Sequence, residues 1–260
     1  MTFSEFYSYL TKYAPLELSK KLCEKDGMYD NSGIILDMEE NADISGIVFT
    51  LDLTSKSVEF ATENGCNLIV THHPAIYSPI KRLECGDAVY LAAKSGIGVI
   101  SMHLNFDCAE RGIDYYLAEG LGAKEQKIVE VLGENVGYGR IFDVDGLTAD
   151  GLLERFKSVF ATQKAFIYGG KAGKIHRIAS FCGAGLDEGA IEAAIFEKAD
   201  AVVSADIKHH VLVEAVEKGL AVLSCTHYST EYYGMKKICE NFAKNHKNQK
   251  IIFYDDERFL

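Results

Sequence analysis

Short apolar runs alternate with longer amphipathic segments along most of this chain. Residues 46–53 (GIVFTLDL), 67–71 (NLIVT) and 98–102 (GVISM) are rich in β-branched and aliphatic side chains, and they predict buried strands. The segments between and after them predict helices, at 55–64, about 83–95 and about 112–121. Strands that alternate with helices of this length indicate βαβ units and a parallel sheet.

The same rhythm returns in the second half of the chain. The pattern there predicts strands at 177–182, 200–205, 221–225 and 250–254, and helices at 187–198, 211–218 and 229–244. In both halves the third strand leads into a histidine that is followed four residues later by a carboxylate, as His103 with Asp107 and His227 with Glu231. The halves therefore resemble two copies of one supersecondary unit.

Two further regions complete the organisation. An amphipathic stretch over 2–27 is broken at Pro15, and 126–175 holds two short strands, at 137–144 and 164–170, around a helix at 147–160. No Pro- or Ser-rich linker separates the halves. We place the boundary near residue 125 and predict two tightly packed, similar α/β domains with mostly parallel sheets, 1–125 and 126–260.

Composition is that of a folded protein with a substantial core. Of the 260 residues, 48% are hydrophobic and 25% are charged. The chain has 27 Lys and Arg against 38 Asp and Glu, a net charge of −11. This balance disfavours a broad surface for nucleic acid or for an anionic membrane, because both need clustered cations. A small phosphorylated ligand, held by two or three local cations, stays compatible with it.

Cysteine usage and hydropathy predict a cytoplasmic protein. The seven cysteines are odd in number and contain no CxxC pair, which favours buried thiols in a reducing compartment over disulfides or a zinc ribbon. The opening MTFSEFYSYL lacks the basic and apolar regions of a secretory signal. No apolar run reaches the roughly 18–20 residues needed to span a bilayer.

Candidate chemistry gathers where predicted strands end. Ligands of parallel sheets bind beyond the carboxyl ends of the strands, and four histidines lie at or just past such ends, namely His72, His73, His103 and His227. Imidazole and carboxylate groups together suit Zn, Mn, Fe or Ni. Two adjacent histidines after a strand cannot face the same way. His72 and His73 would therefore bind two different metal ions, or one would bind metal and the other would support it.

The two histidine–carboxylate pairs strengthen this interpretation. At the start of a helix, residues four apart can point in the same direction. His103 with Asp107, and His227 with Glu231, could each present two ligands to one volume.

Other motifs are less specific. His209 and His210 follow a predicted strand, and outer-shell support, substrate contact and ligation are all open for them. Cys108 and Cys225 are better explained as packing residues. The turn 183–185 could hold an anion on its backbone N–H groups or could simply be tight. The chain has neither a P-loop motif nor a GxSxG elbow.

Seven motifs in order along nearly the whole chain resemble one known family. They are VTHHP (70–74), HLNFD (103–107), GIDYYLAEGLG (112–122), GYGRI (137–141), CGAGLDE (182–188), SADIKHH (204–210) and CTHYSTE (225–231). Together they are similar to the dinuclear-metal proteins known as GTP cyclohydrolase I type 2 homologues, or NGG-one-interacting-factor-like proteins.

The resemblance implies two linked α/β domains, two divalent metal ions in a cleft between them, and often a homohexameric ring. Carried over by position, the metal ligands would be His72, His73, Asp107, His227 and Glu231, with Glu231 as the bridge, and His103 would line the site. Two positions depart from the family. Asn is usual where this chain has Asp114, and Gly is usual where it has Ala205.

The resemblance and the histidine pattern lead to one functional expectation. We expect a metal-dependent hydrolase of a small molecule, with ring-opening hydrolysis of GTP as the family label, and with His103, His209 or His210 as the group that moves the proton. The triphosphate of GTP would need several cations, and Lys81, Arg82, Arg140 and Lys208 are scattered along the chain. The alternative is a non-catalytic metal-binding scaffold or a regulatory interaction protein.

Overall fold

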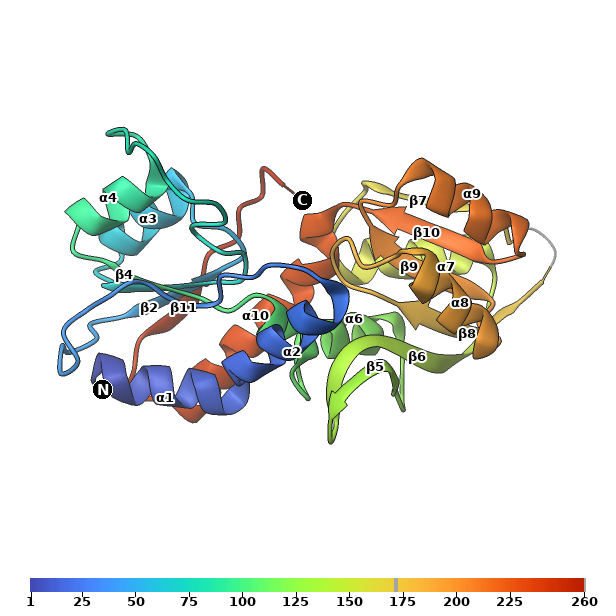
Figure 1. Ribbon diagram of the computed structural model, residues 1–260, viewed down its shortest axis with the longest axis horizontal. Coiled ribbons are helices and arrows are strands. Elements are labelled where there is room, and N and C mark those ends of the chain that lie inside the picture. Colours follow the sequence, from blue (N-terminus) through green and yellow to red (C-terminus); the bar gives the residue numbers. More distant parts are fainter. Residues whose placement is uncertain (171–172, 260) are drawn as a thin grey trace. The chain divides into compact units, whose positions relative to one another are not determined.

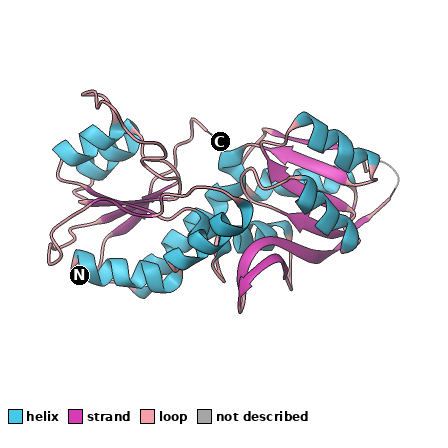
Figure 2. Cartoon of the chain, in the orientation of Figure 1, coloured by secondary structure: helices cyan, strands magenta, loops and turns pink. Residues whose placement is uncertain are grey.

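Helices cover the faces of two sheets in this protein (Figures 1 and 2). The structure is a computed structural model, and it describes residues 1–170 and 173–259. The chain folds into two compact units. Unit 1 consists of Met1–Gly112 and Met235–Asp256, and unit 2 consists of Ile113–Gly234 with the residues from Glu257 onward.

Unit 1 contains a five-stranded sheet in the order β1-β4-β3-β2-β11. Only the edge strand β1 runs antiparallel to its neighbour, and the pairs β4–β3, β3–β2 and β2–β11 are parallel. Its elements are α1 (Phe3–Tyr13), α2 (Leu16–Asp26), β1 (Gly33–Leu36), β2 (Ile47–Thr50), α3 (Ser55–Glu63), β3 (Leu68–Thr71), α4 (Ala88–Lys94), β4 (Gly98–Ser101), α5 (Leu104–Cys108) and β11 (Ile251–Phe253), with the C-terminal part of α10 (His227–Asn245).

The sheet of unit 1 has a core on each face. On one face, Val58 of α3 and Ala92 of α4 belong to an apolar cluster with Val48, Ile69 and Val99 of the sheet. On the other face, aromatic rings from α1, β2 and α10 meet with centroids 5.6–6.4 Å apart, those of Phe6, Phe49 and Phe242. Strands β2, β3 and β4 are therefore buried on both sides, which explains their uninterrupted apolar sequences.

Unit 2 contains a six-stranded sheet in the order β5-β6-β8-β9-β10-β7. Its central pairs β8–β9 and β9–β10 are parallel, and the pairs on either side of them are antiparallel. Helices α8 and α9 pack on the sheet through Ile191 and Val211. Its elements are α6 (Ile113–Leu121), β5 (Lys127–Gly133), β6 (Val136–Leu147), α7 (Ala149–Val159), β7 (Ala165–Tyr168), β8 (Ile175–Ser180), α8 (Glu188–Phe196), β9 (Ala201–Ala205), α9 (His209–Glu217), β10 (Ala221–Cys225) and the start of α10.

The predicted fold class is confirmed, since the protein is a mixed α/β structure in which five of the nine described strand pairs are parallel. The repeated pattern also has a structural counterpart. The segments β2-α3-β3-α4-β4 and β8-α8-β9-α9-β10 each place three consecutive strands side by side and parallel. Proline 15 separates α1 from α2, as its missing N–H predicts.

Some elements differ from the prediction. Helix α4 begins at Ala88 rather than near 83, because the carboxylate of Asp87 accepts a hydrogen bond from the Glu84 N–H in a turn before it. Strands β1 and β5 were not predicted, and both lie at sheet edges with partly exposed side chains. Among the described residues, no helix combines the length and hydropathy needed to cross a membrane.

The bounds of the two units differ from those of the predicted domains 1–125 and 126–260. The chain passes from unit 1 to unit 2 after Gly112, because α6 contacts β6 and α7 of unit 2. It returns within α10, and β11 then pairs in parallel with β2. The C-terminal strand thus completes the sheet of the N-terminal segment.

Candidate metal centre

His72 and His73 continue strand β3 beyond its last residue, Thr71. Their backbone N–H groups donate hydrogen bonds to the Leu51 carbonyl, at 3.1 and 2.9 Å, so the end of β3 stays attached to the end of β2. His72 is completely buried. Both histidines are therefore carried by rigid backbone at the carboxyl end of the sheet, as the sequence predicts.

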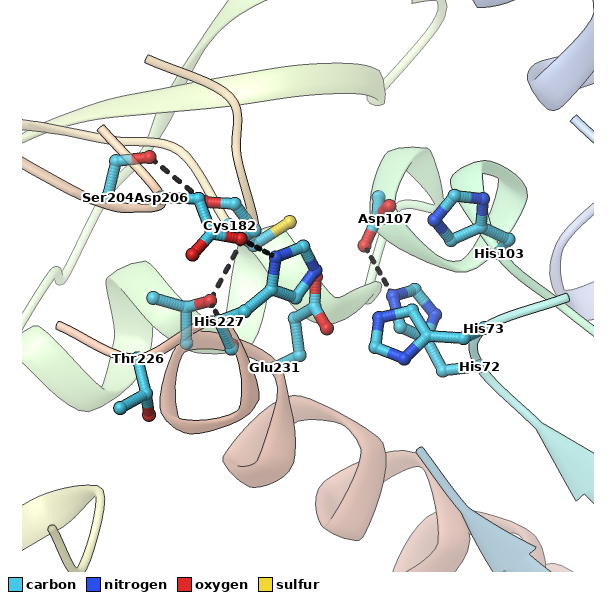
Figure 3. A network of polar contacts seen from close by, with 12 residues as sticks. His72, His73, His103, Asp107, Cys182, Ser204, Asp206, Thr226, His227 and Glu231 are labelled. Carbon is cyan, nitrogen blue, oxygen red and sulfur yellow. Dashed lines mark hydrogen bonds and ion pairs between the residues drawn. The ribbon is translucent and has the colours of Figure 1, made fainter. Parts of the chain in front are cut away.

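The two rings have separate partners. The Nδ1 atom of His72 lies 3.0 Å from the Met102 carbonyl, and its Nε2 atom lies 3.5 Å from the Asp107 carboxylate. The Nδ1 atom of His73 lies 2.8 Å from the carboxylate of Asp52. Asp107 is itself 3% exposed. Unit 1 thus holds a buried histidine–carboxylate pair, with a second histidine beside it (Figure 3).

His103 joins these two rings at the end of β4. Its ring centroid lies 5.2 Å from that of His72 and 5.8 Å from that of His73. One potential ligand atom from each of the three histidines lies within 4.8 Å of the others. The Nδ1 atom of His103 is 2.8 Å from the carboxylate of Asp30. The structure therefore brings together three histidines that the sequence singled out separately.

In unit 2, His227 and Glu231 form the pair that their spacing predicts. Helix α10 begins at His227, and the Nε2 atom of His227 lies 3.0 Å from the Glu231 carboxylate one turn later. Glu231 is 2% exposed, whereas the His227 side chain is 35% exposed. The Nδ1 atom of His227 lies 2.7 Å from the Asp206 carboxylate.

All four histidines share one arrangement, in which Nδ1 faces an oxygen acceptor. The acceptor is a backbone carbonyl for His72 and a carboxylate for the other three. An acceptor at Nδ1 places the imidazole proton there, so Nε2 is the nitrogen that each ring leaves free to bind a metal ion or to accept a proton. This is how proteins usually orient metal-binding histidines.

The supporting carboxylates Asp30, Asp52 and Asp206 were not found from the sequence. Asp206 follows β9 directly and Asp52 follows β2 by two residues, so the rule about strand ends that selected the histidines applies to them as well. Asp30 precedes the short strand β1 and has no such signal.

Replacing Asp206 by asparagine is expected to weaken metal binding about 10- to 100-fold, because the charged support of His227 is lost. Asp206 has φ +47°, a left-handed conformation that asparagine also tolerates, so the backbone should not change. Competition with a chromophoric chelator measures the affinity. Asp145→Asn is the control, since the Asp145 side chain is 91% exposed. Equal affinities in both variants would exclude a supporting role for Asp206.

The glycine turn after β8 lies against the unit 2 pair. The Gly183 N–H donates to the Thr230 hydroxyl at 2.9 Å, and its carbonyl accepts from the Ala205 N–H at 2.9 Å. A Cβ at Gly183 would lie 2.7 Å from the Glu231 carboxylate and 3.1 Å from His227 Nε2. At Gly183 the structure therefore favours a close-approach turn over an anion cradle, because its N–H already has an acceptor.

The remaining candidates lie elsewhere in unit 2. His209 and His210 occupy the first turn of α9 and are exposed, and His210 Nε2 lies 3.2 Å from the Glu188 carboxylate. Among the described residues, neither histidine belongs to a group of side chains close enough to share a metal ion. Burial raises the pKa of the Cys225 thiol to about 12, and this thiol is not part of any group of potential metal ligands among the described residues.

A buried ion pair lies on the other side of the glycine turn. Asp114 accepts a hydrogen bond from the Cys182 N–H at 3.1 Å, and its second oxygen lies 3.7 Å from the Arg140 guanidinium. Burial raises the pKa of Asp114 to about 6, although Arg140 opposes this shift. Arg140 is 1% exposed and donates to the carbonyls of Gly137 and Gly139. It is therefore a structural residue and not a surface cation for phosphate.

Comparison with known proteins identifies relatives along the whole chain. A family model described as Duf34/NIF3 (NGG1p interacting factor 3) matches residues 1–258. The GTP cyclohydrolase 1 type 2 homolog of Clostridium acetobutylicum is 27% identical over 228 residues, which cover 85% of this chain and 81% of that protein. The protein of the same name from Nostoc sp. is 30% identical over 223 residues, covering 82% and 83%.

The fold also has a solved counterpart. The crystal structure of a hypothetical protein from Staphylococcus aureus aligns with 99% of this chain and 96% of its own chain, with a TM-score of 0.86. The two sequences are 24% identical. This likeness concerns the fold, while the function has to be argued from the site.

Proposed function

The chain belongs to the Duf34/NIF3 (NGG1p interacting factor 3) family, and on that premise we propose that it is a metal-dependent hydrolase of a small molecule. The observation that carries the proposal is the shared orientation of the four histidines. Each has Nδ1 on an oxygen acceptor, and two have Nε2 within 3.5 Å of a carboxylate. Imidazole nitrogens and carboxylate oxygens fit divalent Zn, Mn, Fe or Ni.

We propose two metal ions per chain. Their ligands are His72, His73 and Asp107 from unit 1, with His227 and Glu231 from unit 2. Within unit 1 the pair His72–Asp107 supports this, and within unit 2 the pair His227–Glu231 does. The family resemblance implies that both pairs would hold one dinuclear centre, with Glu231 as a ligand that both ions would share.

The chemistry of such a centre divides between the metals and the protein. Two divalent ions supply Lewis acidity and make a water reactive near neutral pH. His103 would move the proton through Nε2, because its Nδ1 faces Asp30. His209 and His210 are the other candidates for this role, and their exposure would let them meet a substrate from solvent.

As the specific reaction we propose ring-opening hydrolysis of GTP. This choice rests on the names of relatives such as the GTP cyclohydrolase 1 type 2 homologs. Of the cations considered for a triphosphate, Arg140 is buried, and Lys81, Arg82 and Lys208 are exposed. Of these four, the exposed three could contact a nucleotide. A homohexamer and a cytoplasmic location belong to the same proposal.

A non-catalytic metal-binding scaffold is the second candidate. The family description as an interacting factor favours it. The metal ligands would be the same in both cases, so only turnover separates the two.

Metal content is the first test. We expect about two metal ions per chain by plasma mass spectrometry, on protein purified without chelator or affinity nickel. His72→Ala and Glu231→Ala should each hold sharply fewer, because each removes a ligand. Absence of metal in the native protein, even after reconstitution, would overturn the proposal.

Turnover is the second test. Metal-loaded protein is incubated with GTP, other nucleotides, phosphoesters and amides, and Asp107→Ala should abolish any metal-dependent hydrolysis. Asp145→Asn, with its exposed side chain, should keep the rate of the native protein. Bound metal without turnover of any of these compounds would favour the scaffold.

A further inference from the structure

Asp30 joins the segment between α2 and β1 to the side chain of His103. It lies between α2 and β1, and its Oδ1 atom is 2.8 Å from Nδ1 of His103. The Asp30 side chain is 3% exposed and the His103 side chain is 17% exposed. Water therefore has little access to this contact, which strengthens its electrostatic part.

Hydroxyl groups hold Asp30 in turn. The Ser32 hydroxyl donates to Oδ2 of Asp30 at 2.5 Å and accepts from the backbone N–H of His103 at 3.0 Å. The Ser19 hydroxyl of α2 lies 3.3 Å from the Ser32 hydroxyl. His103 is thus attached to this segment at two points, through its ring to Asp30 and through its backbone to Ser32.

We infer that Asp30 is a positioning residue for His103, which keeps the imidazole proton on Nδ1 and presents Nε2 to His72 and His73. An ionised carboxylate only accepts hydrogen bonds, so its partner nitrogen must carry the proton. The catalytic meaning of this inference rests on the proposed function, while the orientation of the ring does not.

The charge of Asp30 supports this assignment. Burial alone would raise the pKa of Asp30, but hydrogen bonds from His103, Ser32 and Ser19 outweigh it and lower the pKa to about 2. The group is therefore a carboxylate throughout the neutral range.

Asp30 is also open to chemical rescue. Ser19, Asp30 and Ser32 line a hollow of about 600 Å³ beside α2, together with the exposed residues Lys20 and Gly27. In a variant with a truncated side chain at position 30, a small carboxylate such as formate could enter from this hollow and take the place of the lost group.

The test reads the tautomer of His103 directly. Metal-free protein with ¹⁵N-labelled histidine is examined at pH 8, where ordinary imidazoles are neutral, by two-bond ¹H–¹⁵N correlation spectra. The native protein should show His103 with its proton on Nδ1. Asp30→Ala should move the tautomer ratio toward Nε2–H by about tenfold or more, since a charge-assisted hydrogen bond is lost.

Two comparisons make the result specific. Formate should restore the native tautomer ratio in Asp30→Ala, which a purely structural defect would not allow. Asp26→Ala is the matched control, because Asp26 is an exposed carboxylate four residues before Asp30 in the chain. If Asp30→Ala does not fold, Asp30→Asn replaces it, with a smaller shift because the amide acceptor is neutral.

Two results would overturn the inference. One is a native His103 with its proton on Nε2. The other is a ratio that stays native in the variant at position 30. A protein that binds metal but hydrolyses nothing would instead overturn the hydrolase proposal and leave the tautomer result intact. The two failures are therefore distinguishable.

Discussion

Replacing Gly183 by alanine is expected to lower the free energy of unfolding by about 2–5 kcal/mol and to weaken metal binding. Gly183 has φ +57°, which costs a residue with a Cβ about 1–2 kcal/mol. The new methyl group would also lie 2.7 Å from the Glu231 carboxylate and 3.1 Å from His227 Nε2. Overpacking of this kind costs about 1–3 kcal/mol.

Both proposed ligands of unit 2, Glu231 and His227, must shift to accommodate that methyl group. Urea unfolding measures the stability, and chelator competition measures the metal affinity. Gly189→Ala is the control, because Gly189 lies exposed in α8 and its added Cβ would meet no atom closer than 3.4 Å. That variant should gain about 0.5–1 kcal/mol from helix propensity. A stable Gly183→Ala protein with native metal affinity would contradict the close approach.

Asp114→Asn is expected to change how stability depends on pH. Burial raises the pKa of Asp114 from 3.8 to about 6, so the fold favours the protonated carboxyl group. Its stabilising contribution is complete below pH 3.8 and is lost as the pH rises through about 6. At 1.36 kcal/mol per pKa unit, the free energy of unfolding of the native protein should fall by about 2–3 kcal/mol relative to that of the asparagine variant between pH 4 and pH 8.

The prediction concerns the difference in the free energy of unfolding between the two proteins, and how that difference changes with pH. Loss of the charge at position 114 adds a constant offset, because Arg140 keeps its carbonyl acceptors at Gly137 and Gly139. Urea unfolding of both proteins from pH 4 to pH 8 measures it. Asp145→Asn serves as the exposed control. Parallel stability curves for the native protein and Asp114→Asn would show that the carboxyl group does not titrate in this range.

Most of the fold could be predicted from local patterns. The buried strands β2, β3 and β4 read as apolar runs because both of their faces are covered. The break at Pro15 follows from a missing N–H. The edge strands β1 and β5 escaped prediction because their burial is partial and their pattern weak. Strand β11 is apolar enough to predict, but its partner β2 lies some two hundred residues earlier in the chain.

In the candidate site too, some contacts follow from local sequence patterns and others do not. The contact of His227 with Glu231 follows from helical spacing alone. Asp107 differs, because its carboxylate lies 3.5 Å from Nε2 of His72, which comes from another element and is 35 residues earlier in the chain. No spacing rule could find Asp30, which lies 73 residues before His103.

The sequence by itself determined the alternation of strands and helices, the parallel central strands of each sheet, and the placement of histidines at strand ends, because periodicity and short spacing act within one element. It also carries the motifs that identify the family. Only the tertiary structure decided which acceptor orients each histidine, which glycine approaches Glu231, and which sheet receives β11. These contacts join residues that are distant in the chain, and their free energy depends on burial and on the path of the backbone between them.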